Sequence, residues 1–348
     1  MVDTRPLFQP HSRALATLYA DLETYALSQV EVFVGTAGSL IERSNASGFT
    51  FYAHQTYDGS GRRRERYVAG PVGDATADAR AERLRERIRE LKALVPSFRL
   101  LGREGYVIAD ARTYATLASL HNHGVFAAGG MLIGSHAYGV LLNRLGVRAA
   151  AYGTLDIDIA RSERLRFAEP PQLGFVEMLR ESGVDFQEVP SLDRKRPSTS
   201  FKQRGRSPFH VDLLVPSRDE SYPVVPVPEL RAHATGLPYL RYLLADGQDA
   251  MLLAREGCCR VRVPLPERYA VHKLLVSRMR SGRSVKSESD VLQACVLCAA
   301  LSESHPGAVG AAVAAVPKRA RRYVERGVEV ARPHLESRYV RAWEELTG

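Results

Sequence analysis

The sequence predicts an α/β protein in which a central mixed sheet lies between two helical regions. Short segments rich in apolar and β-branched residues alternate with helical segments in the middle of the chain. Before and after this part, apolar residues recur mainly at helical spacing. Because strands that alternate with helices form a sheet covered by helices, this order indicates an α/β core with helical additions at both ends.

The N-terminal region, residues 1–105, is expected to combine helices with a β-hairpin. Residues 12–45 have apolar positions at helical spacing. In residues 48–71, aromatic and β-branched side chains flank a DGSG turn, which is typical of a hairpin. Residues 74–96 predict an amphipathic helix that ends at a proline. This helix either docks on its neighbours or forms an arm that contacts RNA. Its apolar face consists of Leu84, Ile88, Leu91 and Val95.

The core, residues 106–265, is expected to begin with a helix at 110–123 and the short strand MLI at 131–133. A further helix is predicted at 171–183. From residue 266 onward, the chain is expected to be helical to its end, with breaks near residues 306 and 317, which gives a C-terminal domain of residues 266–348. Strands are predicted at 154–161, 184–190, 209–216, 250–254 and 259–265.

The charge of the chain favours an anionic partner. The net charge is +9, and basic residues gather in segments 61–104, 193–206 and 273–286. Such clusters favour nucleic acid or nucleotide phosphates, although each of them is equally explained as a solvated surface. No apolar run is long enough for a membrane span, and the N-terminus does not resemble a secretory signal. We therefore expect a cytoplasmic protein without a membrane partner.

The four cysteines are interpreted as small buried hydrophobic residues. Cys295 and Cys298 fall in an apolar helical segment, and Cys258 and Cys259 are adjacent in the sequence, with Cys259 at the start of the strand predicted at 259–265. A zinc site is the less favoured alternative, because the loops that usually carry its ligands are absent.

The stretch GGMLIGSHAYG, residues 129–139, predicts a strand that turns into a helix at Gly134 and Ser135. Free backbone N–H groups and the positive end of the helix dipole favour phosphate binding at such a point. Gly134 allows close approach, and Ser135 offers a hydroxyl group. His136 is a weaker candidate for a phosphate contact.

Asp156 and Asp158 are expected to project side by side from one face of a strand, because residues i and i+2 share a face. Two carboxylates at that distance favour a cation between them, and Mg²⁺ suits a site shared with phosphates. A solvent-facing strand with two unrelated acids is the alternative. Asp212 lies inside another apolar strand, and a third carboxylate is what a site with two metal ions requires. Asp212 would then also help to deprotonate the attacking hydroxyl group.

The motifs IGSHAYG, LDIDIA and HVDLL together resemble those of the nucleotidyltransferase (polymerase-β-like) superfamily. The hairpin and the segments RPSTSFKQRG and PERYAVHKLLVSRMR are similar to a bacterial family of uncharacterised nucleotidyltransferase-fold proteins. The resemblance implies a polymerase-β-like core and transfer of a nucleoside monophosphate from an NTP to an acceptor, with release of pyrophosphate. It also implies that Asp156, Asp158 and Asp212 bind two Mg²⁺ ions, or Mn²⁺, and that Gly134 and Ser135 bind the nucleotide.

The segment after the third aspartate resembles the abortive-infection and toxin nucleotidyltransferases. Lys273 and Asp290 match their helix lysine and downstream acid, and Lys273 would then stabilise the triphosphate. A lysine that lies along the protein surface is the alternative. Ser287 stands where those relatives have the first aspartate of D-x-x-D, which argues against a catalytic base there. Arg280 and Lys286 are weaker phosphate candidates.

The acceptor stays open at this stage. The basic clusters favour RNA, such as a tRNA end, as in the toxin-like relatives. A protein side chain or a small molecule is a second possibility, and a non-catalytic nucleic-acid-binding or antitoxin-like module is a third. Residues Ser198, Thr199, Ser200 and Lys202 are either contacts of nucleotide or acceptor or part of a plain polar loop.

Overall fold

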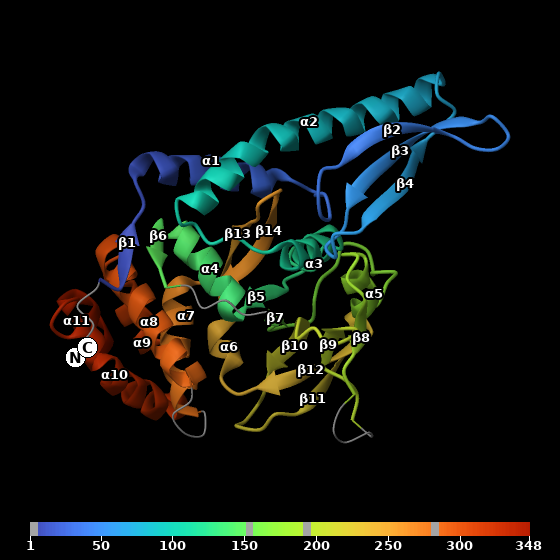
Figure 1. The fold of residues 1–348 in the computed structure, drawn as a ribbon. Coiled ribbons are helices and arrows are strands. Elements are labelled where there is room, and N and C mark those ends of the chain that lie inside the picture. Colours follow the sequence, from blue (N-terminus) through green and yellow to red (C-terminus); the bar gives the residue numbers. More distant parts are fainter. Residues whose placement is uncertain (1–5, 151–155, 191–195, 280–284) are drawn as a thin grey trace.

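The computed structural model describes residues 6–150, 156–190, 196–279 and 285–348. Leu155 and Arg280, and the beginning of the strand expected at 154–161, lie outside these ranges. The chain forms a central mixed sheet, a C-terminal group of helices, and an N-terminal sheet that stands away from the centre together with a long helix (Figure 1). The predicted α/β class with a mixed sheet is confirmed.

The strands are β1 (Phe8–Pro10), β2 (Ser39–Ser44), β3 (Thr50–Tyr57), β4 (Arg63–Ala69), β5 (Met131–Ile133), β6 (Val147–Ala149), β7 (Asp156–Ala160), β8 (Phe186–Glu188), β9 (Ser200–Gln203), β10 (His210–Pro216), β11 (Val224–Val227), β12 (Ala232–Leu237), β13 (Gly247–Leu253) and β14 (Cys258–Pro264). The α-helices are α1 (Arg13–Ser28), α2 (Ala75–Arg103), α3 (Ala111–Asn122), α4 (Gly134–Arg144), α5 (Phe175–Arg180), α6 (Leu240–Leu243), α7 (Pro266–Met279), α8 (Val285–Ser304), α9 (Ala308–Ala314), α10 (Arg321–Leu335) and α11 (Val340–Thr347). Two 3₁₀ helices are η1 (Pro228–Leu230) and η2 (Lys318–Ala320).

The central sheet has the strand order β11-β12-β10-β7-β5, with β9 pairing with β10 and β8 pairing with β9. Strands β7, β10 and β12 run parallel, whereas β5, β9 and β11 are antiparallel to their neighbours. One face of β7 and β10 is fully buried, because side chains alternate along each strand. This buried face consists of Ile157, Ile159, Val211 and Leu213.

The elements predicted for residues 106–265 agree in type with those of the structure. The expected strands at 131–133, 184–190, 209–216, 250–254 and 259–265 and the expected helices at 110–123 and 171–183 are all present, the latter shortened to Phe175–Arg180. The described residues after 265 are helical, as expected. Strands β6, β9, β11 and β12 and the short helix α6 were not expected. The domain boundaries at 105/106 and 265/266 stay a prediction.

The helix expected at 12–45 is wrong beyond Ser28, because residues Ser39–Ser44 form β2. Gly35 and Gly38 adopt φ values of 97° and 63°, which no helix accommodates. Strand β2 pairs with β3 and so completes a three-stranded sheet with the expected hairpin. Helical spacing within the segment cannot reveal these pairing partners, because they lie outside it.

The helix expected to end at Pro96 continues to Arg103. A proline removes one backbone hydrogen bond and usually ends or kinks a helix. Here Phe98 and Leu101 beyond the proline are fully buried in a core that α2 shares with α1 and β13. Their burial favours continuation of the helix despite the lost bond.

The four cysteines are free and buried, as expected of small hydrophobic residues. Burial raises the pKa of Cys258 and of Cys295 to about 12. Both thiols are therefore protonated and uncharged at physiological pH, as small buried hydrophobic side chains are.

Candidate active site

Three acidic side chains lie on one face of the central sheet, on the neighbouring strands β7 and β10. The parallel register places Asp212 directly beside Asp158, and His210 directly beside Asp156. Residues paired across two strands point to the same face, as do residues i and i+2 within one strand. The structure therefore brings together the three carboxylates that the sequence analysis singled out.

His210 lies between two of these carboxylates and was not among the expected site residues. Its Nδ1 lies 3.2 Å from Oδ1 of Asp156, and its Nε2 lies 3.5 Å from Oδ2 of Asp212. The sequence carries a signal for it, since His210 precedes Asp212 by two residues and so shares its face.

Ser200 on β9 donates a hydrogen bond to Oδ1 of Asp212. Its neighbour in the polar segment, Thr199, instead accepts a hydrogen bond from Thr235 of β12 at 2.8 Å. Lys202 pairs with His210 across β9 and β10 and so lies on the same face as the acids. The segment that was predicted to contact nucleotide or acceptor, or else to be a plain polar loop, is thus partly a strand that flanks the acidic cluster.

The surroundings of Asp158 raise the pKa of its carboxyl group. Burial, followed by the negative charge of Asp212, raises the pKa of Asp158 to about 6, against the opposing effect of Lys273. A carboxylate that resists ionisation beside two other carboxylates is a site where a cation would relieve repulsion. The described residues contain no group of three or more His, Cys, Asp or Glu side chains already arranged around a common metal position.

Gly134 forms the turn from β5 into α4 and lies against the acidic cluster. Its φ of 67° lies in the left-handed region, and a Cβ atom at this position would collide with the carboxylate of Asp158. Two independent constraints therefore require glycine here. The residue before it, Ile133, provides no side-chain cap for α4, so the first backbone N–H groups of this helix lack a side-chain acceptor there. Ser135 lies partly exposed in the first turn of the helix.

His136 lies in the same first turn of α4. Burial lowers the pKa of His136, although the charges of Asp110 and Asp156 act in the opposite direction. The imidazole is therefore neutral at physiological pH. Its Nε2 atom is buried and has no hydrogen-bond partner among the described residues.

Lys273 on α7 is not a surface lysine. Its Nζ lies 2.7 Å from Oδ1 of Asp290 on α8, and both side chains are largely buried. The same Nζ lies 5.3 Å from the ring centre of Tyr269, whose hydroxyl donates a hydrogen bond of 2.8 Å to the carbonyl oxygen of Gly134. Lys273 and Asp290 are thus linked to the glycine turn through one tyrosine.

The two remaining candidates near Asp290 lie apart from this pair. Ser287 is buried, and its hydroxyl accepts a hydrogen bond from Arg278 and donates one to the carbonyl oxygen of Ser277. Lys286 is exposed at the start of α8. The serine at the position expected for a first aspartate therefore joins α7 to α8.

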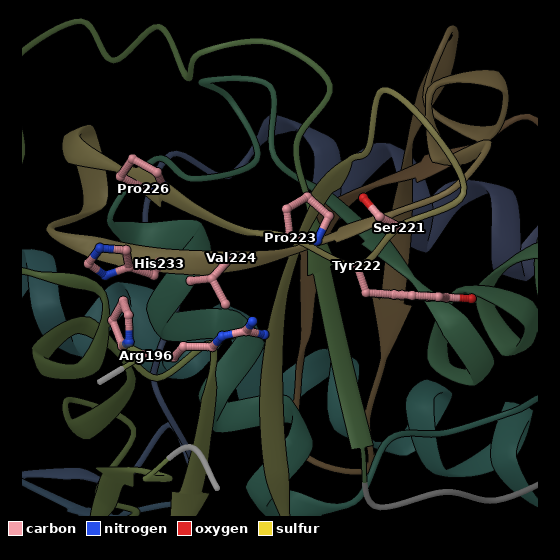
Figure 2. A pocket seen from close by; sticks show the side chains of 8 residues that line it. Arg196, Ser221, Tyr222, Pro223, Val224, Pro226 and His233 are labelled. Carbon is pink, nitrogen blue, oxygen red and sulfur yellow. The ribbon is translucent and has the colours of Figure 1, made fainter. Parts of the chain in front are cut away.

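A shallow hollow of about 690 Å³ lies beside strands β11 and β12 (Figure 2). His233 and Pro226 form a cross-strand pair, as do Thr235 and Val224, and Thr235 also pairs with Leu214 of β10. This pairing places the hollow on the face of the sheet that carries Asp212. Arg196 and Tyr222 also line it, so it offers both a cation and an exposed aromatic ring on the side of the acids.

The comparisons with known proteins agree with this geometry. A family model described as nucleotidyltransferase matches residues 111–316, which is more than half of the chain. The comparison with curated proteins and the comparison with solved structures gave no significant match. Within the described ranges, no helix has the length and apolar character that crossing a membrane requires. The chain belongs to this nucleotidyltransferase family and is an enzyme of that class.

Proposed function

We propose that this nucleotidyltransferase transfers a nucleoside monophosphate from an NTP to a hydroxyl group of RNA and releases pyrophosphate. The register of β7 and β10, which sets Asp158 beside Asp212 with Asp156 on the same face, is the observation that supports it best. Grouped carboxylates are costly, because each one disfavours ionisation of the others. A protein that only binds nucleic acid does not need three grouped carboxylates, so their repulsion would destabilise it without a function.

Asp156, Asp158 and Asp212 would hold Mg²⁺, with two ions expected and Mn²⁺ as the alternative metal. The donor set fits, since Mg²⁺ prefers carboxylate oxygens and shares its remaining positions with phosphates. Bound Mg²⁺ would offset the charge of the triphosphate and make the acceptor hydroxyl group more acidic. His210 contacts both Asp156 and Asp212 and so competes with the metal for these oxygens.

The residues of the chain would act on both ends of the transferred group. Asp212 accepts the proton of the attacking hydroxyl group. The hydroxyl oxygen forms a bond to the α-phosphorus while the bond from that phosphorus to the oxygen bridging to the β-phosphate breaks. Backbone N–H groups at Gly134 and Ser135 hold a phosphate at the start of α4. Lys273, held by Asp290, adds positive charge on the same side.

RNA is the proposed acceptor, in a role like that of the toxin nucleotidyltransferases that the sequence resembles. The net charge of +9 favours a polyanion. The hollow lined by Arg196, His233 and Tyr222 offers a cation and an aromatic ring on the acidic face of the sheet. These are the groups that bind the phosphates and the bases of unpaired RNA.

The proposal is tested by incubating the protein with each labelled NTP, Mg²⁺ and total RNA. The double variant Asp156→Asn/Asp158→Asn is compared with Asp185→Asn, which changes an exposed carboxylate on the same protein. We expect label on RNA, lost by at least about 100-fold in the double variant and retained in the control. Label on the protein or on a small molecule would contradict the RNA acceptor. An equal signal from the double variant would contradict the acidic site.

A further inference from the structure

The N-terminal sheet β2-β3-β4 has one covered and one open face. Helix α2 lies along the covered face (Figure 1). Tyr52 of β3 donates a hydrogen bond of 2.8 Å to Asp78 of α2, and Leu40 packs against the core cluster that α2 shares with α1. Tyr52 and Leu40 therefore point towards α2. Because side chains alternate along a strand, the residues next to them in β2 and β3 point away from α2.

The strand register identifies the residues on the open face. Ala53 of β3 pairs with Tyr67 of β4, and Phe51 pairs with Arg43 of β2. An irregularity in the pairing between Tyr52 and Ala53 inserts one residue into β4, so that Tyr67 points away from α2. The open face also carries Tyr57, Arg63 and the ion pair between Arg43 and Glu65.

Aromatic rings gather on this open face. The ring centres of Phe49 and Phe51 lie 6.3 Å apart, and those of Phe51 and Tyr67 lie 5.6 Å apart. Tyr67 is 57% exposed, Tyr57 51% and Phe49 40%. The solvent-facing side of a sheet is usually polar, and a contiguous group of exposed aromatic rings marks an interaction surface.

The charge around these rings indicates a nucleic acid rather than an apolar partner. The open face carries Arg43 and Arg63 against one acid, Glu65. Arg62 is exposed in the turn at its edge, whereas Arg64 and Arg66 lie on the α2 side of the sheet. Aromatic rings bind bases only when the bases are unstacked, and arginines bind the phosphates between them. A duplex hides the faces of its bases, so the fitting occupant is a single strand.

The sheet is attached firmly to the catalytic core, although it lies outside the residues that match the family model. At the β3–β4 turn, the backbone N–H of Gly59 and the hydroxyl group of Ser60 donate hydrogen bonds of 2.9 Å to the carbonyl oxygens of Ser182 and Gly183, respectively. The buried Asp58 holds Arg64 at 2.7 Å within the same turn. A strand bound on the sheet would therefore be held in a defined position relative to the core.

We infer that the open face of β2-β3-β4 is a platform on which single-stranded RNA stacks, and that it holds the acceptor for the reaction proposed above. The inference rests on that proposed function for the identity of the nucleic acid. The binding of RNA to the open face can be tested independently of the reaction, since this binding requires neither NTP nor the acidic cluster.

Binding is measured on the full chain by fluorescence anisotropy with a labelled oligouridine of about 12 nucleotides, without NTP or divalent metal. We expect Tyr67→Ala to raise the dissociation constant about tenfold, since one stacked base is lost. We expect Arg63→Gln to reduce the slope of log affinity against log salt by about 0.7. Val330→Ala is the control, because Val330 is an exposed residue of α10 that lies in neither proposed RNA site, and it should bind as the wild type does. Tyr222→Ala tests the hollow beside β11 separately.

Several results would overturn the platform. These are unchanged binding by Tyr67→Ala, a loss confined to Tyr222→Ala, a preference for duplex, or loss of self-association by Tyr67→Ala with RNA binding intact. The Asp156→Asn/Asp158→Asn protein separates the two proposals, because it should bind the oligonucleotide at least as well as the wild type. If RNA binds as expected but no NTP is consumed, the catalytic proposal fails and the platform stands. If transfer to RNA occurs and Tyr67→Ala has no effect on binding, the platform fails and the catalytic proposal stands.

Discussion

Gly134 is constrained both by its backbone conformation and by a neighbouring carboxylate. Its left-handed φ of 67° and the closeness of the Asp158 carboxylate leave no space for a side chain. Gly146, at the other end of α4, has nearly the same φ of 66°, but a Cβ atom added there would meet no atom within 4 Å. Substituting alanine at each of the two glycines therefore separates the cost of the backbone conformation from the cost of the contact with Asp158.

We expect Gly146→Ala to lower the free energy of unfolding by about 1–2 kcal/mol, because alanine is strained at positive φ. Gly134→Ala should lower it by more, since its new methyl group also collides with the carboxylate of Asp158. Gly134→Ala should in addition abolish nucleotide transfer, since the new methyl group displaces Asp158. Denaturant unfolding and transfer assays on both variants measure this. Equal activity losses in the two variants would show that the contact with Asp158 does not matter.

The acidic cluster illustrates what single residues reveal in the sequence. Asp156, Asp158 and Asp212 are recognisable because a charged residue on an apolar strand stands out from its neighbours. His210 occupies an equally informative position but attracts less attention, since one histidine beside an aspartate is common. Ser200 was found only as part of a polar segment, because its contact with Asp212 depends on the pairing of β9 with β10.

At the scale of elements, the ion pair between Lys273 and Asp290 joins α7 to α8. The Asp290 side chain is 6% exposed and that of Lys273 13%. Removing one member of such a buried pair takes a compensating charge away from the other, whereas replacing both with apolar residues is far less costly. The pair therefore has a structural role that the sequence resemblance does not convey.

We expect Lys273→Met to lower the free energy of unfolding by about 3–5 kcal/mol, and Lys273→Met/Asp290→Leu to recover most of this loss. If Lys273 also stabilises the triphosphate, the double variant will be stable but will have a raised KM for NTP or a reduced kcat. Thermal unfolding and steady-state kinetics measure the two effects separately. A stable double variant with normal kinetics would leave Lys273 a purely structural residue.

Elements whose character depends on distant partners were the ones that the sequence mispredicted. Strand β2 has helical spacing but pairs with β3, and α2 continues beyond Pro96 because Phe98 and Leu101 are buried. In both cases tertiary contacts outweigh a local preference worth about 1–3 kcal/mol. The described helices after residue 265 were predicted correctly in type, although α10 also contains a proline, Pro333.

At the scale of the whole molecule, one core cluster extends from α3 through the central sheet to α11, and a second joins α1, α2 and β13. His272 of α7 is buried within the first region, and its Nε2 has no hydrogen-bond partner in the described part of the chain. Burial, with a smaller effect from Lys273, lowers the pKa of His272 to about 3. Burial also lowers the pKa of His11, His54, His121 and His136.

These histidines should make the protein sensitive to acid. A group whose pKa is lower in the folded than in the unfolded state stabilises the fold above the unfolded value of 6.5, and this stability is lost as the pH falls towards 3. In this range, His272 alone should lower the free energy of unfolding by up to about 1.4 kcal/mol per pH unit. Asp158 has the opposite sign, because its raised pKa favours the fold at low pH, and this contribution is lost as the pH rises through about 6.

We expect His272→Leu to flatten the decline of the melting temperature between pH 6.5 and pH 4, with little change at neutral pH, since no hydrogen bond of Nε2 is lost. His305→Leu, at an exposed position, is the control and should leave the decline unaltered. Calorimetry across this range measures both. An identical decline in wild type and His272→Leu would mean that this histidine is already protonated or hydrated in the fold.

The sequence by itself determined the α/β class, the helical C-terminal part, the glycine turn and the three acids, because each of these depends on spacing within a few residues. The tertiary structure alone decided which side chains meet. It set His210 and Ser200 against the acids, paired Lys273 with Asp290, and turned residues 39–44 into a strand. Strand register and helix packing join residues far apart in the chain, and the energies that select them are sums over many contacts that no local pattern contains.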